Sequence, residues 1–267
     1  MTRIVQALFI AVGVLALVLA AGFFLQSAWA TSLWPFATSR LSNIFLSSML
    51  AAIGVPLIWL GASGDLAAAR GGAADMAMTH GGIAAFTAQA WMSNPQNAGA
   101  LNYAMFSGAL LIVFIALLAW TSRLSFRDTR PTPPLVRWSF AIFSVGLLFF
   151  GAKLALVTPG AFPWPLTREQ SVIYGWMFLG SAVIFGYGAL RPLWSNAKTQ
   201  LLGFLAYDLV LLGPFIFHFE TVRPELWWNL VIYVVVLSYS AALAIYYLFV
   251  DRELRLRTGH LTATAAG

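Results

Sequence analysis

The chain has no cysteine and few charged residues, and each scarcity excludes a class of protein. Without cysteine there can be no disulfide, no thiolate metal site and no cysteine nucleophile. Charged residues make up 9% of the 267 positions, whereas a soluble domain carries roughly 25%. A water-facing surface cannot be built from so few charges, so the sequence predicts a protein embedded in a lipid bilayer.

Motifs for phosphate or metal chemistry are also missing. No Ser-His-Asp order or paired-carboxylate metal motif is visible, and Gly71-Gly72 lacks the spacing and the lysine of a phosphate-binding loop. The net charge of +6 could suggest nucleic acid. The arginines, however, sit at the ends of apolar segments, where they set topology and meet anionic lipid. We therefore expect the lipid bilayer, and no nucleic acid, as a partner.

Hydrophobic residues make up 60% of the chain. They gather in runs of about 20 residues, the length that a spanning helix needs. Eight spans are predicted, at residues 4–26, 41–61, 66–92, 101–121, 138–157, 171–190, 199–219 and 226–250. The first run is too long for the apolar region of a signal peptide, so we expect it to remain in the protein.

The segment 66–92 is the least apolar of the eight. It is rich in alanine and glycine and carries Arg70, Asp75 and His80. Lipid would reject these side chains, so a spanning helix here must be enclosed by the other helices. An amphipathic helix on the membrane surface is the alternative.

Landmarks in the first half recur in the second half in the same order and at nearly constant spacing. The matches are Val12-Gly13-Val14-Leu15 with Val145-Gly146-Leu147-Leu148, Trp34-Pro35-Phe36 with Trp164-Pro165-Leu166, Ser42-x-Ile44-Phe45 with Ser171-x-Ile173-Tyr174, and Asp75-Met76-Ala77-Met78 with Asp208-Leu209-Val210-Leu211. The predicted fold is therefore an all-α integral membrane protein whose eight transmembrane helices form a parallel tandem repeat of two four-helix units. The predicted parts are the repeats 1–122 and 138–257, a cytoplasmic linker 123–137 and a flexible tail 258–267.

The distribution of basic residues predicts the orientation. With eight spans and the N-terminus inside, 11 of the 15 Lys and Arg residues lie on the cytoplasmic side and 3 lie outside. This is the positive-inside pattern. It predicts a multi-pass protein of the cell inner (plasma) membrane with both termini cytoplasmic and both Trp-Pro loops external.

Two aspartates are the main candidate functional residues. Asp75 and Asp208 each lie about nine residues into a predicted helix, which is roughly 14 Å deep and near the middle of the hydrocarbon core. A charged side chain at that depth marks a functional site by default. We predict that the pair binds ions or protons, one acid per repeat, with Tyr207 beside the second. The alternative is that each acid bonds to neighbouring helices and holds the bundle together.

Lys153 is a possible supporting residue, in the outer half of its predicted span. It could reach the outer interface by snorkelling, pair with Glu220, or extend towards Asp208. A retinal-binding lysine is disfavoured because nothing around Lys153 resembles a retinal pocket.

His80 and His218 lie towards the outer ends of their predicted helices. Facing each other, they could hold a haem, another pigment or a metal, but they do not occupy equivalent repeat positions and no second ligand motif reinforces them. We therefore expect no metal and no cofactor, and ordinary hydrogen-bonded histidines. Gly213-Pro214 should kink the seventh span and free carbonyl groups nearby, which favours a binding cavity there.

These features favour passage or ion- or proton-coupled transport of a small solute over catalysis. A non-catalytic subunit or assembly factor of a larger membrane complex is the first alternative, in which wide helix faces would contact partner proteins or a second copy of the chain. An intramembrane lipid-modifying enzyme that uses Asp75, His80, Asp208 and His218 is the second. A transporter needs a cavity that reaches the aspartates, whereas an enzyme needs acid and histidine close to a common point.

Overall fold

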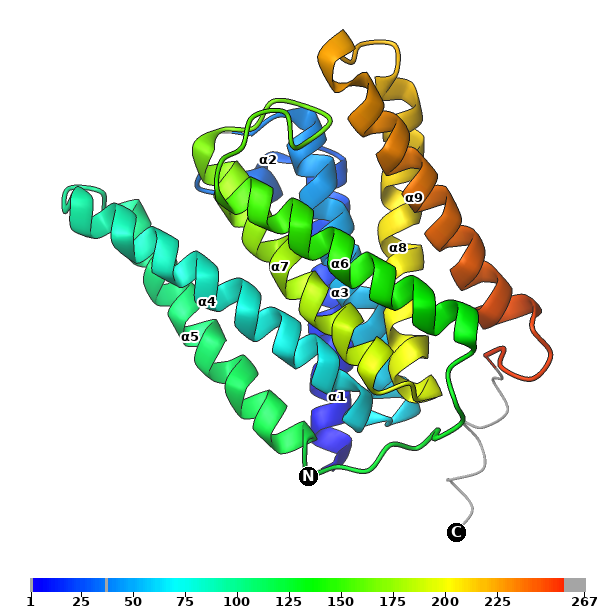
Figure 1. Cartoon of the computed structure of the whole chain (residues 1–267). Coiled ribbons are helices and arrows are strands. Elements are labelled where there is room, and N and C mark those ends of the chain that lie inside the picture. Colours follow the sequence, from blue (N-terminus) through cyan, green and yellow to red (C-terminus); the bar gives the residue numbers. More distant parts are fainter. Residues whose placement is uncertain (1, 37, 257–267) are drawn as a thin grey trace. The chain divides into compact units, whose positions relative to one another are not determined.

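The computed structural model describes residues 2–36 and 38–256, which fold into helices joined by turns and longer loops (Figure 1). Within these residues no strand forms, and an isolated bridge joins Pro131 to Leu193. The all-α class is therefore confirmed. The long helices are α1 (Thr2–Phe24), α3 (Arg40–Ser63), α4 (Ala69–Ser93), α5 (Ala98–Thr121), α6 (Pro134–Ala155), α7 (Arg168–Leu190), α8 (Trp194–His218) and α9 (Trp227–Ile245). The short ones are α2 (Ala28–Thr31), η1 (Leu66–Ala68), η2 (Pro224–Leu226) and the π-helical turn η3 (Tyr246–Val250).

Within the described residues, seven helical segments are long and apolar enough to cross a membrane, which supports a multi-pass membrane protein. They are Arg3–Phe24, Arg40–Ser63, Ala98–Thr121, Pro134–Ala155, Arg168–Leu190, Trp194–His218 and Pro224–Val250. Helix α4 is as long as the others but is not among them, because its many alanine and glycine residues and its polar residues, which include Arg70, Asp75 and His80, lower its hydropathy. The prediction of eight spans is thus supported at seven segments and stays a prediction for α4.

Local sequence signals explain where several helices begin. The side chain of Ser39 accepts a hydrogen bond from the Ser42 amide at the start of α3, and Thr167 does the same for Gln170 at the start of α7. Helix α6 begins at Pro134, whose missing amide proton costs nothing at a first helical position. The last part of the predicted linker is therefore helical. The predicted tail 258–267 lies outside the described residues.

The chain divides into two compact units. Unit 1 comprises Met1–Trp34, Thr38–Leu66 and Lys198–Gly267, and thus holds α1, α3, α9 and nearly all of α8. Unit 2 comprises Pro35–Ala37 and Ala67–Ala197, and holds α4, α5, α6 and α7. Each unit therefore takes one helix pair from each predicted half of the chain.

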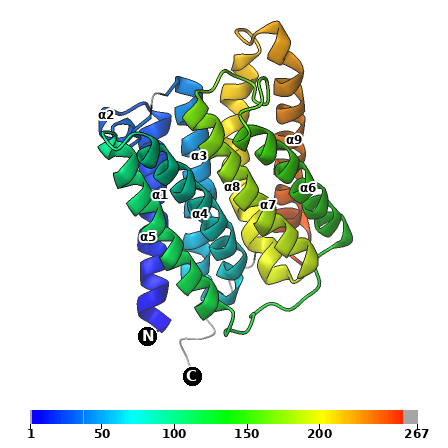
Figure 2. The same ribbon diagram turned by 60° about the vertical axis from the view of Figure 1, so that its left-hand side comes forward.

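In unit 1, α1 and α3 lie side by side because small residues line their contact (Figures 1 and 2). A Cβ atom added to Gly13 would lie 2.8 Å from the backbone oxygen of Gly54, so the two backbones nearly touch. The hydroxyl of Ser47 on α3 donates to the carbonyl of Ala20 on α1 at 2.7 Å. This bond adds a polar contact between the two helices.

Helix α8 packs on another face of α3. A Cβ atom on Gly203 would lie 3.0 Å from the backbone oxygen of Ala52. The rings of Phe45 and Tyr207 meet edge to face with their centroids 6.2 Å apart. Helices α8 and α9 then run alongside each other as a hairpin in both ribbon views.

In unit 2, the hairpins α4–α5 and α6–α7 are joined by an extensive contact between α4 and α7. The closest approach lies at Gly82 of α4, where an added Cβ atom would overlap the indole ring of Trp176. On α7, an added Cβ atom at Gly180 would lie 2.7 Å from the backbone oxygen of Asp75. The glycines of both helices thus make this contact possible.

Arg70 ties the start of α4 to the end of α5. Its guanidinium donates to the carbonyl oxygens of Thr121, at 2.7 Å, and Leu124, at 3.0 Å. It also lies 4.9 Å from the centre of the Phe126 ring. Carbonyl groups at a helix end have no partner within the helix and carry partial negative charge. The terminal nitrogens of the Arg70 side chain therefore bond to protein groups, whereas its buried Nε atom has no hydrogen-bond partner within the described residues.

The segment between α5 and α6 is held in place by the turn between α7 and α8. The Trp194 amide donates to the Arg130 carbonyl at 2.8 Å, and the Thr132 amide donates to the Pro192 carbonyl at 2.9 Å. The Asp128 amide donates to the Ser195 hydroxyl at 3.0 Å. The predicted linker is thus an ordered part of unit 2.

Candidate functional site

Asp208 lies in the middle of α8 and is fully buried, with 0% of its surface exposed. Its Oδ2 atom lies 2.7 Å from the hydroxyl of Ser240 on α9. Its Oδ1 atom is buried and has no hydrogen-bond partner within the described residues. A buried carboxyl group with one unsatisfied oxygen is costly, so such a group requires an explanation in function or in protonation.

The hydroxyl group of Ser240 has one proton to donate but more than one hydrogen-bond acceptor within reach. Besides Asp208, its hydroxyl lies 2.9 Å from the Val236 carbonyl oxygen of its own helix. One hydroxyl donates a single hydrogen bond and accepts up to two. Its proton can therefore point to Asp208 or back into α9, and the two orientations suit different protonation states of the acid.

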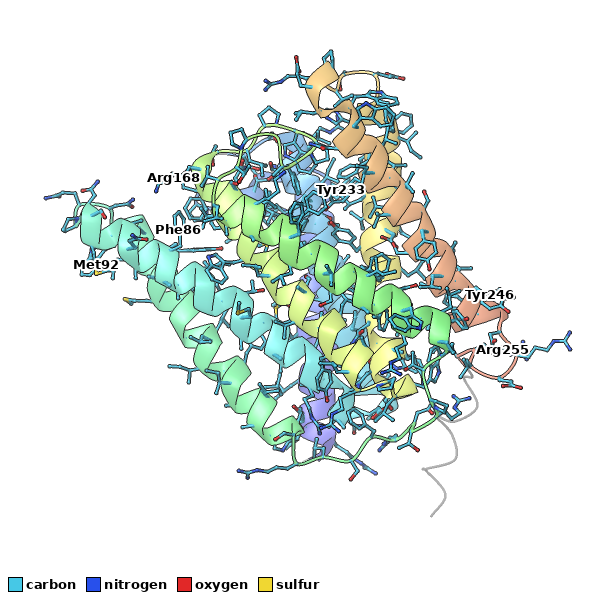
Figure 3. The ribbon with its side chains drawn as sticks, viewed as in Figure 1. Phe86, Met92, Arg168, Tyr233, Tyr246 and Arg255 are labelled. Carbon is cyan, nitrogen blue, oxygen red and sulfur yellow. The ribbon has the colours of Figure 1, made fainter. Side chains whose placement is uncertain are left out.

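Tyr207, the residue before Asp208, forms a second hydrogen bond between α8 and α9. The hydroxyl groups of Tyr207 and Tyr233 lie 2.6 Å apart, and either can donate. The Tyr233 ring packs edge-on against Phe215, with 5.2 Å between centroids; Figure 3 labels Tyr233 on α9. The predicted support from Tyr207 is thus a bond across the helix pair rather than a bond to Asp208.

Asp75 lies on the face of α4 that contacts α7, and it is buried. Its Oδ1 atom is 3.2 Å from the hydroxyl of Thr79, one turn further along α4. That hydroxyl also lies 3.3 Å from the carbonyl oxygen of Trp176 on α7. Asp75 and Asp208 therefore share a motif, a buried carboxyl group beside a hydroxyl that can turn to a backbone carbonyl instead.

Lys153 and Glu220 are the other predicted supporting residues. The ammonium group of Lys153 lies 5.6 Å from the centre of the Phe149 ring of its own helix. Glu220 is exposed in the turn after α8. Lys153 belongs to unit 2, whereas Glu220 and Asp208 belong to unit 1. The pairing of Lys153 with Glu220 or with Asp208 therefore stays a prediction.

The two histidines have different surroundings. The His80 ring stacks on Phe114 of α5 with 5.6 Å between centroids, and its Nδ1 atom is buried without a hydrogen-bond partner within the described residues. The Nδ1 atom of His218 lies 3.0 Å from the Thr221 hydroxyl just beyond α8. They belong to different units, and a haem or pigment between them stays untested. Within residues 2–36 and 38–256, no three or more His, Asp and Glu side chains cluster as metal ligands do.

Each unit contains a cavity, and neither of these two cavities is lined by an aspartate. The cavity in unit 1 is a widely open hollow of about 460 Å³ with a mostly apolar lining that includes Leu17, Ser47, Leu209 and Val210. Leu209 and Val210 directly follow Asp208, whose own side chain contacts α9 instead. The lining of the cavity in unit 2 includes the charged residues Arg168 and Glu169.

Ser240 and Thr79 are the site residues that sequence reasoning missed. A serine or threonine inside an apolar helix is common and carries no signal by itself. One signal was present: Ser107 precedes Ser240 by the same number of positions that separates Asp75 from Asp208. Ser107 and Ser240 are both buried in the structure.

Comparisons of the chain with protein-family models, with curated protein sequences and with solved structures found no match.

Proposed function

We propose that this chain is a membrane transport protein in which Asp208 binds and releases a proton, or a small cation in its place, during passage of a small solute. The observation that carries this proposal is the pair of hydrogen-bond arrangements open to Asp208 and Ser240. With these two arrangements, Asp208 has a hydrogen-bond partner both when ionised and when protonated, as binding and release of a proton require.

The two arrangements differ by the rotation of one hydroxyl group. When Asp208 is ionised, the Ser240 hydroxyl donates to Oδ2, and Oδ1 keeps free acceptor capacity for a cation. When Asp208 is protonated, its own hydroxyl donates to Ser240, and Ser240 donates to the Val236 carbonyl 2.9 Å away. Every proton then has an acceptor. A proton can thus be taken up with little rearrangement of heavy atoms.

The sequence of α8 supplies a place for the movement that transport requires. Pro214 lies inside the helix and has no amide proton, so it cannot donate to the carbonyl of Val210, four residues earlier. Gly213 has open space where a side chain would lie. A helix weakened here can bend and expose the acid one and a half turns away to the cavity lined by Leu209 and Val210.

The proposed architecture is a tandem repeat of eight spans with both termini in the cytoplasm. Helix α4 has 25 residues, which at 1.5 Å each gives about 37 Å, enough for a hydrocarbon core of about 30 Å. The composition of the units supports the repeat. If α1, α3, α4 and α5 correspond to α6, α7, α8 and α9, the helices of unit 1 map onto those of unit 2 as a set.

Proton flux in liposomes tests the proposal. Purified protein is reconstituted with a pH-sensitive dye inside, and a membrane potential is imposed to drive protons inward. We expect the wild type to acidify the lumen, Asp208→Asn to abolish this, and the exposed control Glu225→Gln to behave as the wild type. Asp75→Asn should act in parallel with Asp208→Asn if both repeats carry protons. Equal flux in Asp208→Asn and wild type would refute the proposal and favour a structural subunit.

A further inference from the structure

Unit 2 contains a cavity that no part of the proposed transport mechanism uses. It lies where α4 ends and α7 begins, with the Trp-Pro loop of the first half forming one wall, and we name it the α4–α7 cavity. Its volume of about 440 Å³ falls in the range of small-molecule sites, about 300–1,000 Å³. Figure 3 labels two of its lining residues, Phe86 on α4 and Arg168 on α7.

Two opposite charges stand next to each other on the wall formed by α7. Arg168 and Glu169 are the first two residues of this helix, and both line the cavity. Within the described part of the chain, neither side chain makes a hydrogen bond or an ion pair, with each other or with any other group. A guanidinium and a carboxylate that do not neutralise each other are both available to a ligand.

The backbone that carries these charges is fixed. The Thr167 side chain accepts from the Gln170 amide at 3.2 Å, and the Gln170 side chain accepts from the Thr167 amide at 3.1 Å. This reciprocal capping box locks the first turn of α7. The two charges therefore project from a rigid platform, which reduces the entropy that binding would cost.

Aromatic and amide side chains also line the cavity. Phe36 and Phe86 line it, and Phe36 is held in place by an edge-on contact with Tyr103, with centroids 5.4 Å apart. The Asn97 side-chain oxygen accepts from the Ala100 amide, which leaves its NH₂ group to donate to a ligand. The cavity thus combines aromatic surface with a pair of opposite charges.

We propose that the α4–α7 cavity binds a small zwitterion, an α-amino acid with an apolar side chain. Arg168 would hold the carboxylate, because a guanidinium matches a carboxylate with two parallel hydrogen bonds. Glu169 would hold the ammonium group, and the apolar side chain would lie against Phe36 and Phe86. A simple anion would be repelled by Glu169 and a simple cation by Arg168, so a ligand that carries both charges fits best. This site does not depend on Asp75, Asp208 or the transport proposal.

Binding to the full-length protein in nanodiscs tests this site by calorimetry. The probes are leucine, phenylalanine and methionine, each compared with its amide, which lacks the carboxylate, and its N-acetyl derivative, which lacks the ammonium group. We expect at least one free amino acid to bind and both of its derivatives to bind at least tenfold more weakly, because a hydrogen bond to a charged group is lost in each.

Variants assign each charge to its partner. Arg168→Gln should weaken binding of the amino acid at least tenfold and abolish the difference between acid and amide. Glu169→Gln should also weaken binding of the amino acid at least tenfold, and it should abolish the difference between the free amino acid and its N-acetyl derivative. Both side chains are exposed, so the fold should be retained, as size-exclusion chromatography would check. Arg223→Gln and Glu225→Gln, which do not line the cavity, are the matched controls.

Three outcomes would overturn the proposal. One is that none of the three amino acids binds the wild type. Another is that the amide or the N-acetyl derivative binds as tightly as the free amino acid. The third is that Arg168→Gln and Glu169→Gln bind with the affinity of their controls. Loss of proton flux in the Asp208 variant would leave all three results unchanged, so the two proposals can fail separately.

Discussion

Adding one methyl group to Gly82 should separate α4 from α7, whereas the same change at Gly81 should not. A Cβ atom at position 82 would overlap the indole ring of Trp176, a rigid group that cannot simply rotate away. A Cβ atom at position 81 would lie 3.5 Å from the nearest atom of the Leu111 side chain, which is ordinary van der Waals contact. Of these two adjacent residues in α4, only Gly82 therefore has no room for a methyl group.

The magnitude follows from comparing the two variants. Each Gly→Ala change gains up to about 1 kcal/mol of helix propensity, and this gain cancels because both positions lie inside α4. Overpacking a tight contact costs about 1–3 kcal/mol. We therefore expect Gly82→Ala to have a free energy of unfolding about 1–3 kcal/mol lower than Gly81→Ala. Gly81→Ala itself should be as stable as the wild type or more stable.

Reversible unfolding in mixed detergent micelles, followed by tryptophan fluorescence, measures these differences. Trp176 is one of the tryptophans that report, and circular dichroism checks that helix content is retained. Gly72→Ala is a second control, since nothing lies within 4 Å of its added atom. Equal stabilities for the variants at positions 81 and 82 would refute the close contact between α4 and α7.

The remaining predictions concern the acid, the arginine anchor and the topology. Asp208→Leu should destabilise the protein, whereas Asp208→Asn should change its stability little, because the amide retains a hydrogen-bond partner for Ser240. Hydrogen bonds between membrane helices average about 0.6 kcal/mol, so the difference between the two variants in thermal unfolding should be modest. Arg70→Ala should lower the free energy of unfolding by about 1.5–3 kcal/mol through loss of charged hydrogen bonds to two carbonyl groups, against no measurable change for the exposed control Arg3→Ala. A single cysteine at Arg127 in this cysteine-free chain should react with a membrane-impermeant thiol reagent only after the cells are opened; labelling of intact cells would contradict the cytoplasmic placement.

Sequence reasoning predicted the helices well because their signals are local. Apolar runs of sufficient length, capping residues such as Thr167 and proline at position 134 each act within a few residues. Asp75 and Asp208 could be singled out as candidates for the same reason, since a charge inside an apolar run is visible without knowledge of any neighbour. Helix α4 matched its predicted segment closely even though its composition differs from that of the other long helices.

The partners of the candidate residues could not be predicted, because they depend on how distant helices meet. The contact of Asp208 with Ser240 requires α8 and α9 to pair in one register. The contact of Gly180 with Asp75 requires α4 to cross α7. The α4–α7 cavity combines residues from the first Trp-Pro loop, α4, α5 and α7, and no local pattern connects these segments.

The interleaving of the two units has a consequence for how the protein is made. Unit 2 is nearly continuous in the chain, so its four helices can assemble soon after residue 197 leaves the ribosome. Unit 1 begins with α1 and α3 but needs α8 and α9 to be complete. At roughly 5–20 residues per second, the α1–α3 pair waits for several seconds to half a minute with the surface around Ala52 uncovered. During that interval the α1–α3 pair can pair wrongly with other helices or be bound by an insertion chaperone. A chain truncated before α8 should therefore associate with other proteins through this uncovered surface rather than form a smaller stable protein.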